Sequence, residues 1–180
     1  MNYINKILIV ATNFGLFIAF WFLLSVNASA AEKIDWQNGG AKTGKRLAVL
    51  DFSSKGISLP MRDLLTEQFR QNIKKLNIYE VLDASMTNQV DIFYPGERVY
   101  GECKSKACIL EIGKLLKVNF VVAGTIIEKE KEYFIKGKMY SIDLEQEVQG
   151  FSIDNVSAID SIRLEMKKLS YNVSGLEVPD

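Results

Sequence analysis

Two cysteines, Cys103 and Cys108, have the spacing that most directly suggests chemistry in this chain of 180 residues. Four residues separate them, which is not the C-x-x-C spacing of a thiol redox enzyme. Two cysteines in a chain without histidine also cannot form a zinc site of the usual kind. In an exported protein such a pair typically forms a disulfide, which restrains the unfolded chain by about 2 kcal/mol. We therefore favour a structural disulfide over free buried thiols, and both over redox or metal chemistry.

The absence of histidine limits the catalytic chemistry that the chain can perform. It removes Ser-His and Cys-His nucleophile pairs, the usual general base near neutral pH and the commonest metal ligand. Neither phosphate-binding glycine motif, G-x-x-x-x-G-K-[ST] or G-x-G-x-x-G, occurs in the sequence. We therefore predict no catalytic, cofactor-binding or metal-binding residue.

Two aspartates, Asp51 and Asp83, follow predicted strands and are the remaining candidates for chemistry. Ligands of α/β proteins often bind at the carboxyl ends of strands. A lone aspartate at such a position is more often a turn or cap residue. A hydrolase or small-ligand site would require these carboxylates to converge in space, which their spacing in the sequence does not indicate.

The first 30 residues have the pattern of a targeting segment. Lys6 provides positive charge, Phe14 to Val26 is apolar, and Ala28-Ser29-Ala30 is an A-x-A cleavage signal. We expect a signal peptide cleaved after Ala30, which would place the protein in the periplasm or otherwise outside the cytoplasm. The alternative is an uncleaved inner-membrane anchor over Ile7–Val26. No cysteine lies near the cleavage site, so a lipid anchor of the bacterial lipoprotein type is not expected.

Charge and composition favour a globular protein that does not bind nucleic acid. The chain has 22 basic and 22 acidic residues, whereas a nucleic-acid protein should show a basic excess. Residues 31–45 are polar and contain three glycines, which predicts a flexible leader. Trp36 is the single aromatic residue of this leader, and it either folds back onto the domain or contacts a partner.

Hydrophobic periodicity predicts one α/β domain over residues 46–171, followed by a tail over residues 172–180. The fold class is α/β with an α+β tendency, a single mixed sheet of about five strands packed with helices. The expected order is β-α-β-α-α-β-β-β-α after the signal helix. We expect Val118–Ile127 to be the central strand, because its nearly continuous apolar run indicates burial on both faces. The other strands are predicted over Leu47–Leu50, Ile78–Leu82, Tyr133–Ile142 and Glu147–Ile153, with a turn at Ser53–Gly56.

The helices are predicted from apolar residues at helical spacing. We expect Ser58 to cap one helix, and Ser105 to cap another by accepting a hydrogen bond from a first-turn amide. Gly113 lies inside the second helix, where glycine costs about 1 kcal/mol relative to alanine, so we expect close packing against the sheet there. The predicted buried positions are Met61, Leu64, Leu65, Phe69, Ile73 and Leu76 in the first helix and Cys108, Ile112, Leu115 and Leu116 in the second.

The segment before the cysteine pair is rich in aromatic residues. Phe93, Tyr94 and Tyr100 lie in or beside a predicted loop that contains the breakers Pro95 and Gly96. An ordered aromatic loop beside a disulfide is a good contact surface for a partner. The alternative is that these rings cover the edge of the core.

With these pieces in place, the chain resembles the small exported α/β domains grouped with the curli-secretion protein CsgG, the amino-terminal domain of TolB and the lipoprotein activators of penicillin-binding proteins. The matching pieces are R-L-A-V-L-D-F, I-Y-E-V-L-D-A-S-M, C-K-S-K-A-C-I-L-E-I-G-K-L-L-K-V-N-F-V-V-A-G-T-I and M-Y-S-I-D-L-E, which cover most of residues 46–169. The resemblance implies a bacterial envelope protein, associated with the outer membrane in many relatives, that binds other envelope proteins without catalysis. The chain lacks the lipid-bearing cysteine of those relatives and the long hairpins of the curli pore.

The sequence therefore predicts a non-enzymatic periplasmic or cell-envelope adaptor that docks onto an envelope protein complex. The alternative is an exported small-ligand-binding protein or hydrolase that uses the carboxylates at the strand ends. We expect no cofactor, and contact with the membrane only if Ile7–Val26 stays uncleaved.

Overall fold

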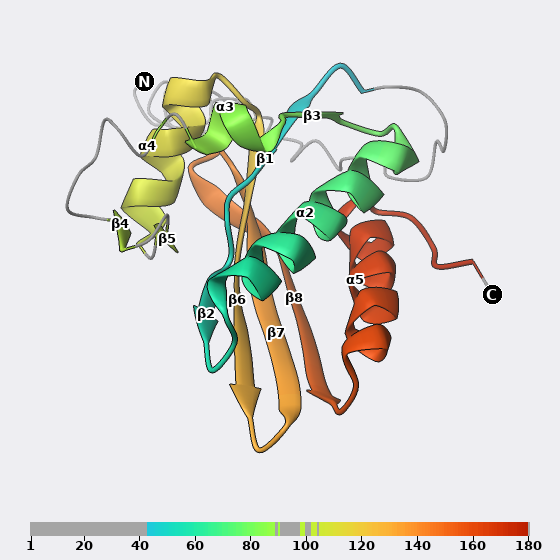
Figure 1. The fold of residues 1–180 in the computed structure, drawn as a ribbon. Helices are drawn as coiled ribbons and strands as arrows, with labels where there is room; N and C mark the ends of the chain where they lie inside the picture. Colours follow the sequence, from blue (N-terminus) through green and yellow to red (C-terminus); the bar gives the residue numbers. More distant parts are fainter. Residues whose placement is uncertain (1–42, 89, 91–97, 100–101, 104, 180) are drawn as a thin grey trace, which may run out of the picture. The chain divides into compact units, whose positions relative to one another are not determined.

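The computed structural model describes residues 43–88, 90, 98–99, 102–103 and 105–179 (Figure 1). The predicted signal peptide, most of the leader with Trp36, and the aromatic residues Phe93, Tyr94 and Tyr100 lie outside the described residues. At the end of the leader, the Thr43 hydroxyl donates a hydrogen bond of 2.9 Å to the main-chain carbonyl of Ile78. None of the helices described combines the length and apolar character needed to cross a bilayer.

In the described part of the chain, six strands form one mixed sheet. They are β1 (Arg46–Val49), β2 (Ser53–Lys55), β3 (Glu80–Val81), β6 (Phe120–Lys129), β7 (Glu132–Ser141) and β8 (Gln146–Val156). The strand order is β3-β1-β6-β7-β8, and β2 also pairs with β6. Pairing is parallel among β1, β2, β3 and β6, whereas β6–β7 and β7–β8 are antiparallel. The predicted fold class and the central position of β6 are confirmed.

The predicted turn at Ser53–Gly56 is wrong, because Ser53 to Lys55 form β2. These residues pair in parallel with Thr125 to Ile127 of β6. The chain turns one step later at Gly56, whose φ of +87° favours glycine and where an added Cβ would overlap the main chain of Glu128. A second short sheet, also missed, joins β4 (Arg98–Val99) to β5 (Glu102–Cys103).

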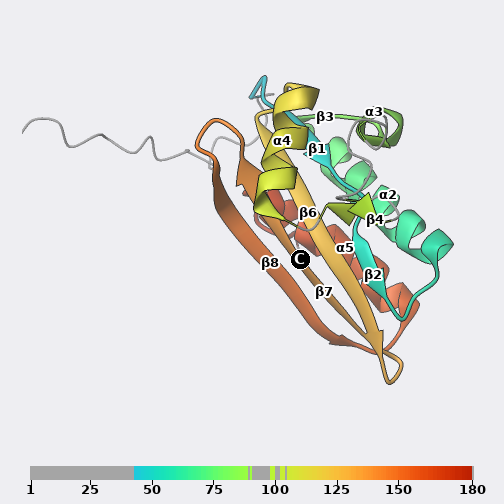
Figure 2. The ribbon, with the colours of Figure 1, turned by 90° about the vertical axis from the view of Figure 1, so that its left-hand side faces the viewer.

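Helices cover the two faces of the sheet unequally (Figures 1 and 2). On one face α2 (Leu59–Leu76) and α5 (Ile159–Val173) enclose the larger core, which includes Leu65, Phe69, Ile126 and Met166. On the other face α4 (Lys106–Leu116) encloses a smaller core with residues of β1, β6 and β7. The short helix α3 (Ala84–Asn88) follows β3.

Two leucines predicted to be buried are exposed. Leu64 of α2 and Leu115 of α4 are each 48% exposed, whereas the adjacent Leu65 is fully buried and the adjacent Leu116 is partly buried. Adjacent positions on a helix differ by about 100° in direction, so a sheet packed against one side covers only one of two neighbouring leucines. Helical spacing alone does not choose between them.

The predicted start of each of these two helices is confirmed, but only one serine forms a cap. Ser105 precedes α4, and its hydroxyl accepts a hydrogen bond of 3.1 Å from the amide of Cys108. Ser58 occupies the cap position of α2 without a side-chain cap bond. At the other end of the domain, α5 continues to Val173, past the predicted start of the tail, and Val173 and Ser174 are buried.

Candidate functional site

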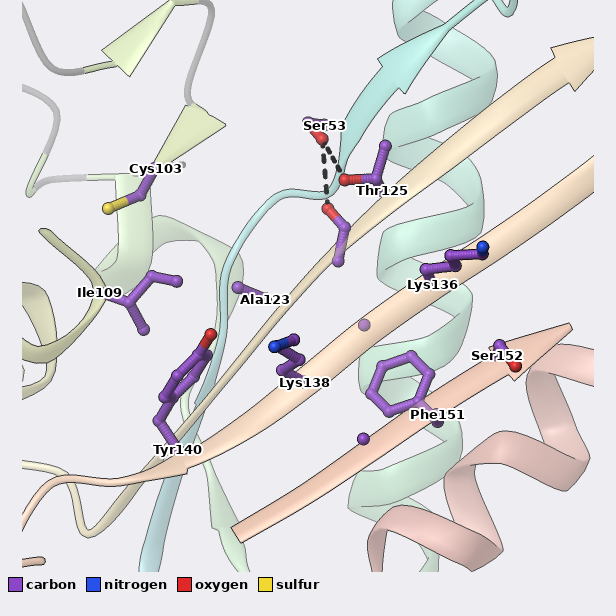
Figure 3. Close-up of a pocket in the computed structure, with 13 residues that line it drawn as sticks. Ser53, Cys103, Ile109, Ala123, Thr125, Lys136, Lys138, Tyr140, Phe151 and Ser152 are labelled. Carbon is purple, nitrogen blue, oxygen red and sulfur yellow. Dashed lines mark hydrogen bonds between the residues drawn. The ribbon is translucent and has the colours of Figure 1, made fainter. Parts of the chain in front are cut away.

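A hollow with a volume of about 660 Å³ lies on the face of the sheet that carries α4 (Figure 3). The middle of β6, β7 and β8 forms its floor, while β2 and the corner where β5 meets α4 contribute further residues. The lining residues are Ser53, Cys103, Ile109, Ala123, Gly124, Thr125, Lys136, Gly137, Lys138, Tyr140, Gly150, Phe151 and Ser152.

The hollow exists because α4 is too short to cover the whole face. A helix of 11 residues spans about 16 Å, whereas a strand of 10 residues such as β6 spans about 33 Å. Phe120, Val121 and Val122 are buried, but Ala123 and Thr125 are only half-buried. The expectation that β6 is buried on both faces therefore holds for its first half and is wrong for its second half. We call this uncovered part, from Ala123 and Thr125 across to Gly150 and Ser152, the open face.

Hydroxyl groups form the polar side of the hollow. The Ser53 Oγ and Thr125 Oγ1 atoms lie 2.6 Å apart, and Ser53 Oγ also lies 3.4 Å from the main-chain oxygen of Gly124 (Figure 3). Either hydroxyl can be the donor of the shorter bond. When Ser53 donates its proton to the Gly124 carbonyl, Thr125 donates to Ser53. When Ser53 instead donates to Thr125, the Thr125 proton is left to donate to a ligand. Ser152 of β8 adds an exposed hydroxyl group. It pairs with Lys136 of β7, so β7 lies between Ser152 and the hydroxyl of Thr125 on β6.

Two lysines of β7, Lys136 and Lys138, supply positive charge to the open face. The Lys138 Nζ lies 2.6 Å from a carboxylate oxygen of Glu147, and this hydrogen bond raises the pKa of Lys138 above its ordinary value. Lys136 is exposed and forms no ion pair within the described part of the chain. The described lining residues include no carboxylate. The hollow can therefore bind an anionic or hydrogen-bonding group.

The disulfide joins Cys103 to Cys108 at one end of the hollow. The two Cα atoms are 6.0 Å apart, and the bond ties the end of β5 to the first turn of α4. Cys108 is buried, and Cys103 lines the hollow together with Ile109 of α4. The disulfide therefore helps to position the wall of the hollow.

Asp51 lies beside a buried arginine rather than in the hollow. Arg70 of α2 is 2% exposed, and its Nη2 atom donates a hydrogen bond of 2.9 Å to the carbonyl of Val49. The same nitrogen lies 3.4 Å from a carboxylate oxygen of Asp51, and Arg70 also contacts Glu67. This arrangement attaches α2 to the end of β1, which gives Asp51 a structural role.

Asp83 forms a separate ion pair on the surface. Its carboxylate lies 2.8 Å from the Nζ atom of Lys74, and this hydrogen bond lowers the pKa of Asp83 below its ordinary value of 3.8. Neither Asp83 nor Asp51 lines the hollow. The structure therefore gives each strand-end carboxylate its own cation from α2 and does not bring them together in a pocket.

The predicted contact residues Phe93, Tyr94 and Tyr100 lie outside the described residues, so their role stays a prediction. The open-face residues Lys136, Lys138 and Ser152 were not predicted as a site. One signal was present, because Lys136-Gly137-Lys138 places two charges on one face of a strand whose other face carries the buried Ile135 and Met139. Among the described residues, no cluster of cysteines and carboxylates is suited to hold a metal ion.

No family model and no curated protein matches this chain. The fold is similar to that of the LpoB C-terminal domain from Escherichia coli, with a TM-score of 0.51 and 12% identity over 66% of this chain and 87% of that domain. The solution structure of Escherichia coli LpoB gives a TM-score of 0.52 and 10% identity, covering 64% of this chain and 58% of that protein. A lipoprotein from Neisseria meningitidis gives a TM-score of 0.53 and 9% identity, covering 72% of this chain and 96% of that one.

These similarities identify the class of the domain, an LpoB-like α/β fold. At identities of this size the similarity establishes a shared fold, and function does not follow from fold alone. The likeness to CsgG and to the amino-terminal domain of TolB stays a prediction from the sequence.

Proposed function

We propose that this protein is a non-enzymatic adaptor of the bacterial cell envelope that docks onto an envelope protein complex. The observation that carries the proposal is the open face, a half-covered sheet lined by hydroxyl groups and lysines. Its fold is shared with LpoB and with a lipoprotein, and the targeting segment supports export. The resemblance noted from the sequence implies the same kind of function.

The docking surface combines the open face with the aromatic loop that precedes the disulfide. Cys103, which follows this loop in the sequence, ends β5 and lines the hollow. Phe93, Tyr94 and Tyr100 are the contact residues that we propose within the loop. Aromatic side chains provide large contact areas at little entropic cost, which suits an interface.

Export is part of the proposal. A signal peptide cleaved after Ala30 would release the domain into the periplasm, whereas an uncleaved Ile7–Val26 segment would tether it to the inner membrane. Sequencing the amino terminus of the protein purified from envelope fractions distinguishes the two. A chain that starts at Ala31 supports the released form, and a chain that starts at Met1 supports the tether.

A second candidate is an exported protein that binds a small anionic ligand. The specific observation in its favour is the hollow, whose volume of about 660 Å³ is within the range of about 300–1,000 Å³ seen for small-molecule sites. The hydrolase form of this alternative has less support, since Asp51 and Asp83 are paired with Arg70 and Lys74 away from the hollow.

Affinity purification of the full chain from envelope extracts, followed by mass spectrometry, tests the adaptor function. We expect one envelope protein to be recovered in stoichiometric amounts and to bind again when both proteins are purified. A triple Phe93→Ala, Tyr94→Ala, Tyr100→Ala variant should lose that binding. Full binding by the triple variant would reject the loop as part of the surface, and the absence of any partner that binds again would reject the adaptor function.

A further inference from the structure

The strand β8 lies at the margin of the sheet, with its outer backbone edge unpaired in the described part of the chain (Figure 2). It is long, and residues Gln149 to Ile153 pair with Met139 to Ile135 in unbroken register. An exposed edge strand presents a row of main-chain donors and acceptors that an extended segment can pair with. The regular stretch of β8 is therefore suited to accept another strand.

The open face extends to this edge. Gly150, Phe151 and Ser152 of β8 line the hollow, and Gly150 and Ser152 are exposed. Gly150 lies opposite Lys138, and Ser152 lies opposite Lys136. Only the short hydroxymethyl group of Ser152 therefore separates Lys136 from the edge, whereas the carboxylate of Glu147 lies close to Gly150. A lysine side chain is long enough to extend over Ser152 to a residue on an added strand.

The charges along the edge favour one acidic residue near its middle. Lys138 already forms an ion pair with the carboxylate of Glu147, whereas Lys136 forms no ion pair among the described residues. Asp154 is exposed toward the other end of β8. An acid placed beside Ser152 can pair with Lys136, whereas acids beside Glu147 or Asp154 would meet a like charge.

We propose that β8 binds an extended segment of a partner protein by strand addition, with a central carboxylate of that segment seated on Lys136. This inference rests on the proposed adaptor function and names the chemistry of the partner. The main-chain bonds provide the affinity, and the carboxylate fixes the register of the added strand. On the face toward α5, alternate side chains of the added strand are apolar.

A designed peptide tests this inference on the full chain. The probe is an acetylated and amidated heptapeptide, Val-Thr-Val-Asp-Val-Thr-Val, whose binding is measured by fluorescence anisotropy and located by amide hydrogen exchange. We expect binding at submillimolar concentration and added protection within residues 146–156. A peptide with lysine in place of the aspartate should bind at least tenfold more weakly, and so should a peptide N-methylated at alternate residues. The first control removes the carboxylate, and the second removes main-chain donors.

Two matched charge reversals complete the test. Lys136→Glu should weaken binding of the aspartate peptide at least tenfold and improve binding of the lysine peptide. Lys75→Glu, at an exposed lysine of α2, should leave the binding of both peptides unchanged. No binding of the aspartate peptide at millimolar concentration, equal binding of the lysine peptide, protection outside β8, or a dimer of the chain that protects β8 without peptide would each overturn the proposal.

The Lys136→Glu variant distinguishes a failure of this inference from a failure of the adaptor function. If a purified envelope partner binds Lys136→Glu as well as the parent protein, the strand-addition proposal is wrong and the adaptor function stands. If the peptide binds as expected but no envelope partner is found, the adaptor function is wrong and the edge site stands.

Discussion

Gly113 of α4 lies directly against Ile142, the residue that follows β7. A Cβ atom at position 113 would be 2.6 Å from the Cγ1 atom of Ile142 and 2.9 Å from the Cγ2 atom of Val121. Real Cβ atoms do not approach other atoms this closely, so the helix rests on the sheet at this point because residue 113 has no side chain. The contact sets the height of α4 above β6 and β7, and therefore the wall of the hollow.

We predict that Gly113→Ala destabilises the protein despite alanine being the better helix former. Alanine gains about 1 kcal/mol in helix propensity, but overpacking against two buried β-branched side chains costs about 1–3 kcal/mol. The net loss should be about 1 kcal/mol in urea unfolding. Adding Ile142→Val, which removes the nearest methyl group, should recover part of the loss. A more stable Gly113→Ala variant would show that α4 is free to move away from the sheet.

We predict that Arg70 is needed for stability rather than for a reaction at Asp51. Arg70→Met keeps most of the buried volume but leaves the Val49 carbonyl without its donor and the Asp51 carboxylate without its cation. Breaking such a buried pair should cost about 3 kcal/mol, measured by urea unfolding. Asp51→Asn should cost less, because the hydrogen bond from Arg70 to Val49 remains. Parent-like stability of Arg70→Met would contradict the structural role.

The disulfide gives a third prediction. Intact protein from the envelope should contain no thiol that reacts with an alkylating reagent until a reductant is added. Reduction should lower the free energy of unfolding by about 2 kcal/mol, because the bond restrains the unfolded chain. A variant with both Cys103→Ala and Cys108→Ala should show the same loss and no further response to reductant. Free thiols in the envelope protein would rule out the bond.

The surface ion pairs give a fourth prediction, on pH. Hydrogen bonds from Lys74 and Lys114 hold the pKa values of Asp83 and Glu145 below their ordinary values of 3.8 and 4.5. Because these pKa values are lower in the folded state, the stabilisation is complete above the unfolded values. It is lost as the pH falls through the folded ones.

Urea unfolding between about pH 3 and pH 6 measures this effect, which should be small and screened by salt because both pairs are exposed. Asp83→Asn should reduce the pH dependence. Asp154→Asn is the control, at an exposed carboxylate with no ion pair in the described part of the chain. An unchanged pH dependence in Asp83→Asn would show that its pair with Lys74 does not form in solution.

The sequence was sufficient to predict the main strands because burial has a clear period in them. The apolar run into Val122 and the alternation around Ile135 and Met139 indicate a central strand and its antiparallel neighbour. The start of α4 after Ser105 and its close packing against the sheet at Gly113 were also predicted. These features are local, or depend on one residue meeting a surface.

The open face could not be predicted from the sequence, because it depends on how much of β6 the helix α4 covers. The apolar run of β6 continues past Ala123 to Ile127, although α4 covers only its first half. Ser53-Ser54-Lys55 has no apolar alternation, so its pairing with β6 leaves no signal in the sequence. The ion pairs of Asp51 and Asp83 likewise join residues of different elements.

Photocrosslinking in living cells tests most directly the claim that the open face contacts an envelope protein. A photoreactive amino acid would replace Ser152 on the open face or, as the control, Lys75 on α2. We predict that one envelope protein crosslinks at position 152 and not at position 75, and that the same protein, once purified, binds the full chain. Absence of a crosslink at position 152, or the same set of crosslinked proteins at both positions, would contradict the claim.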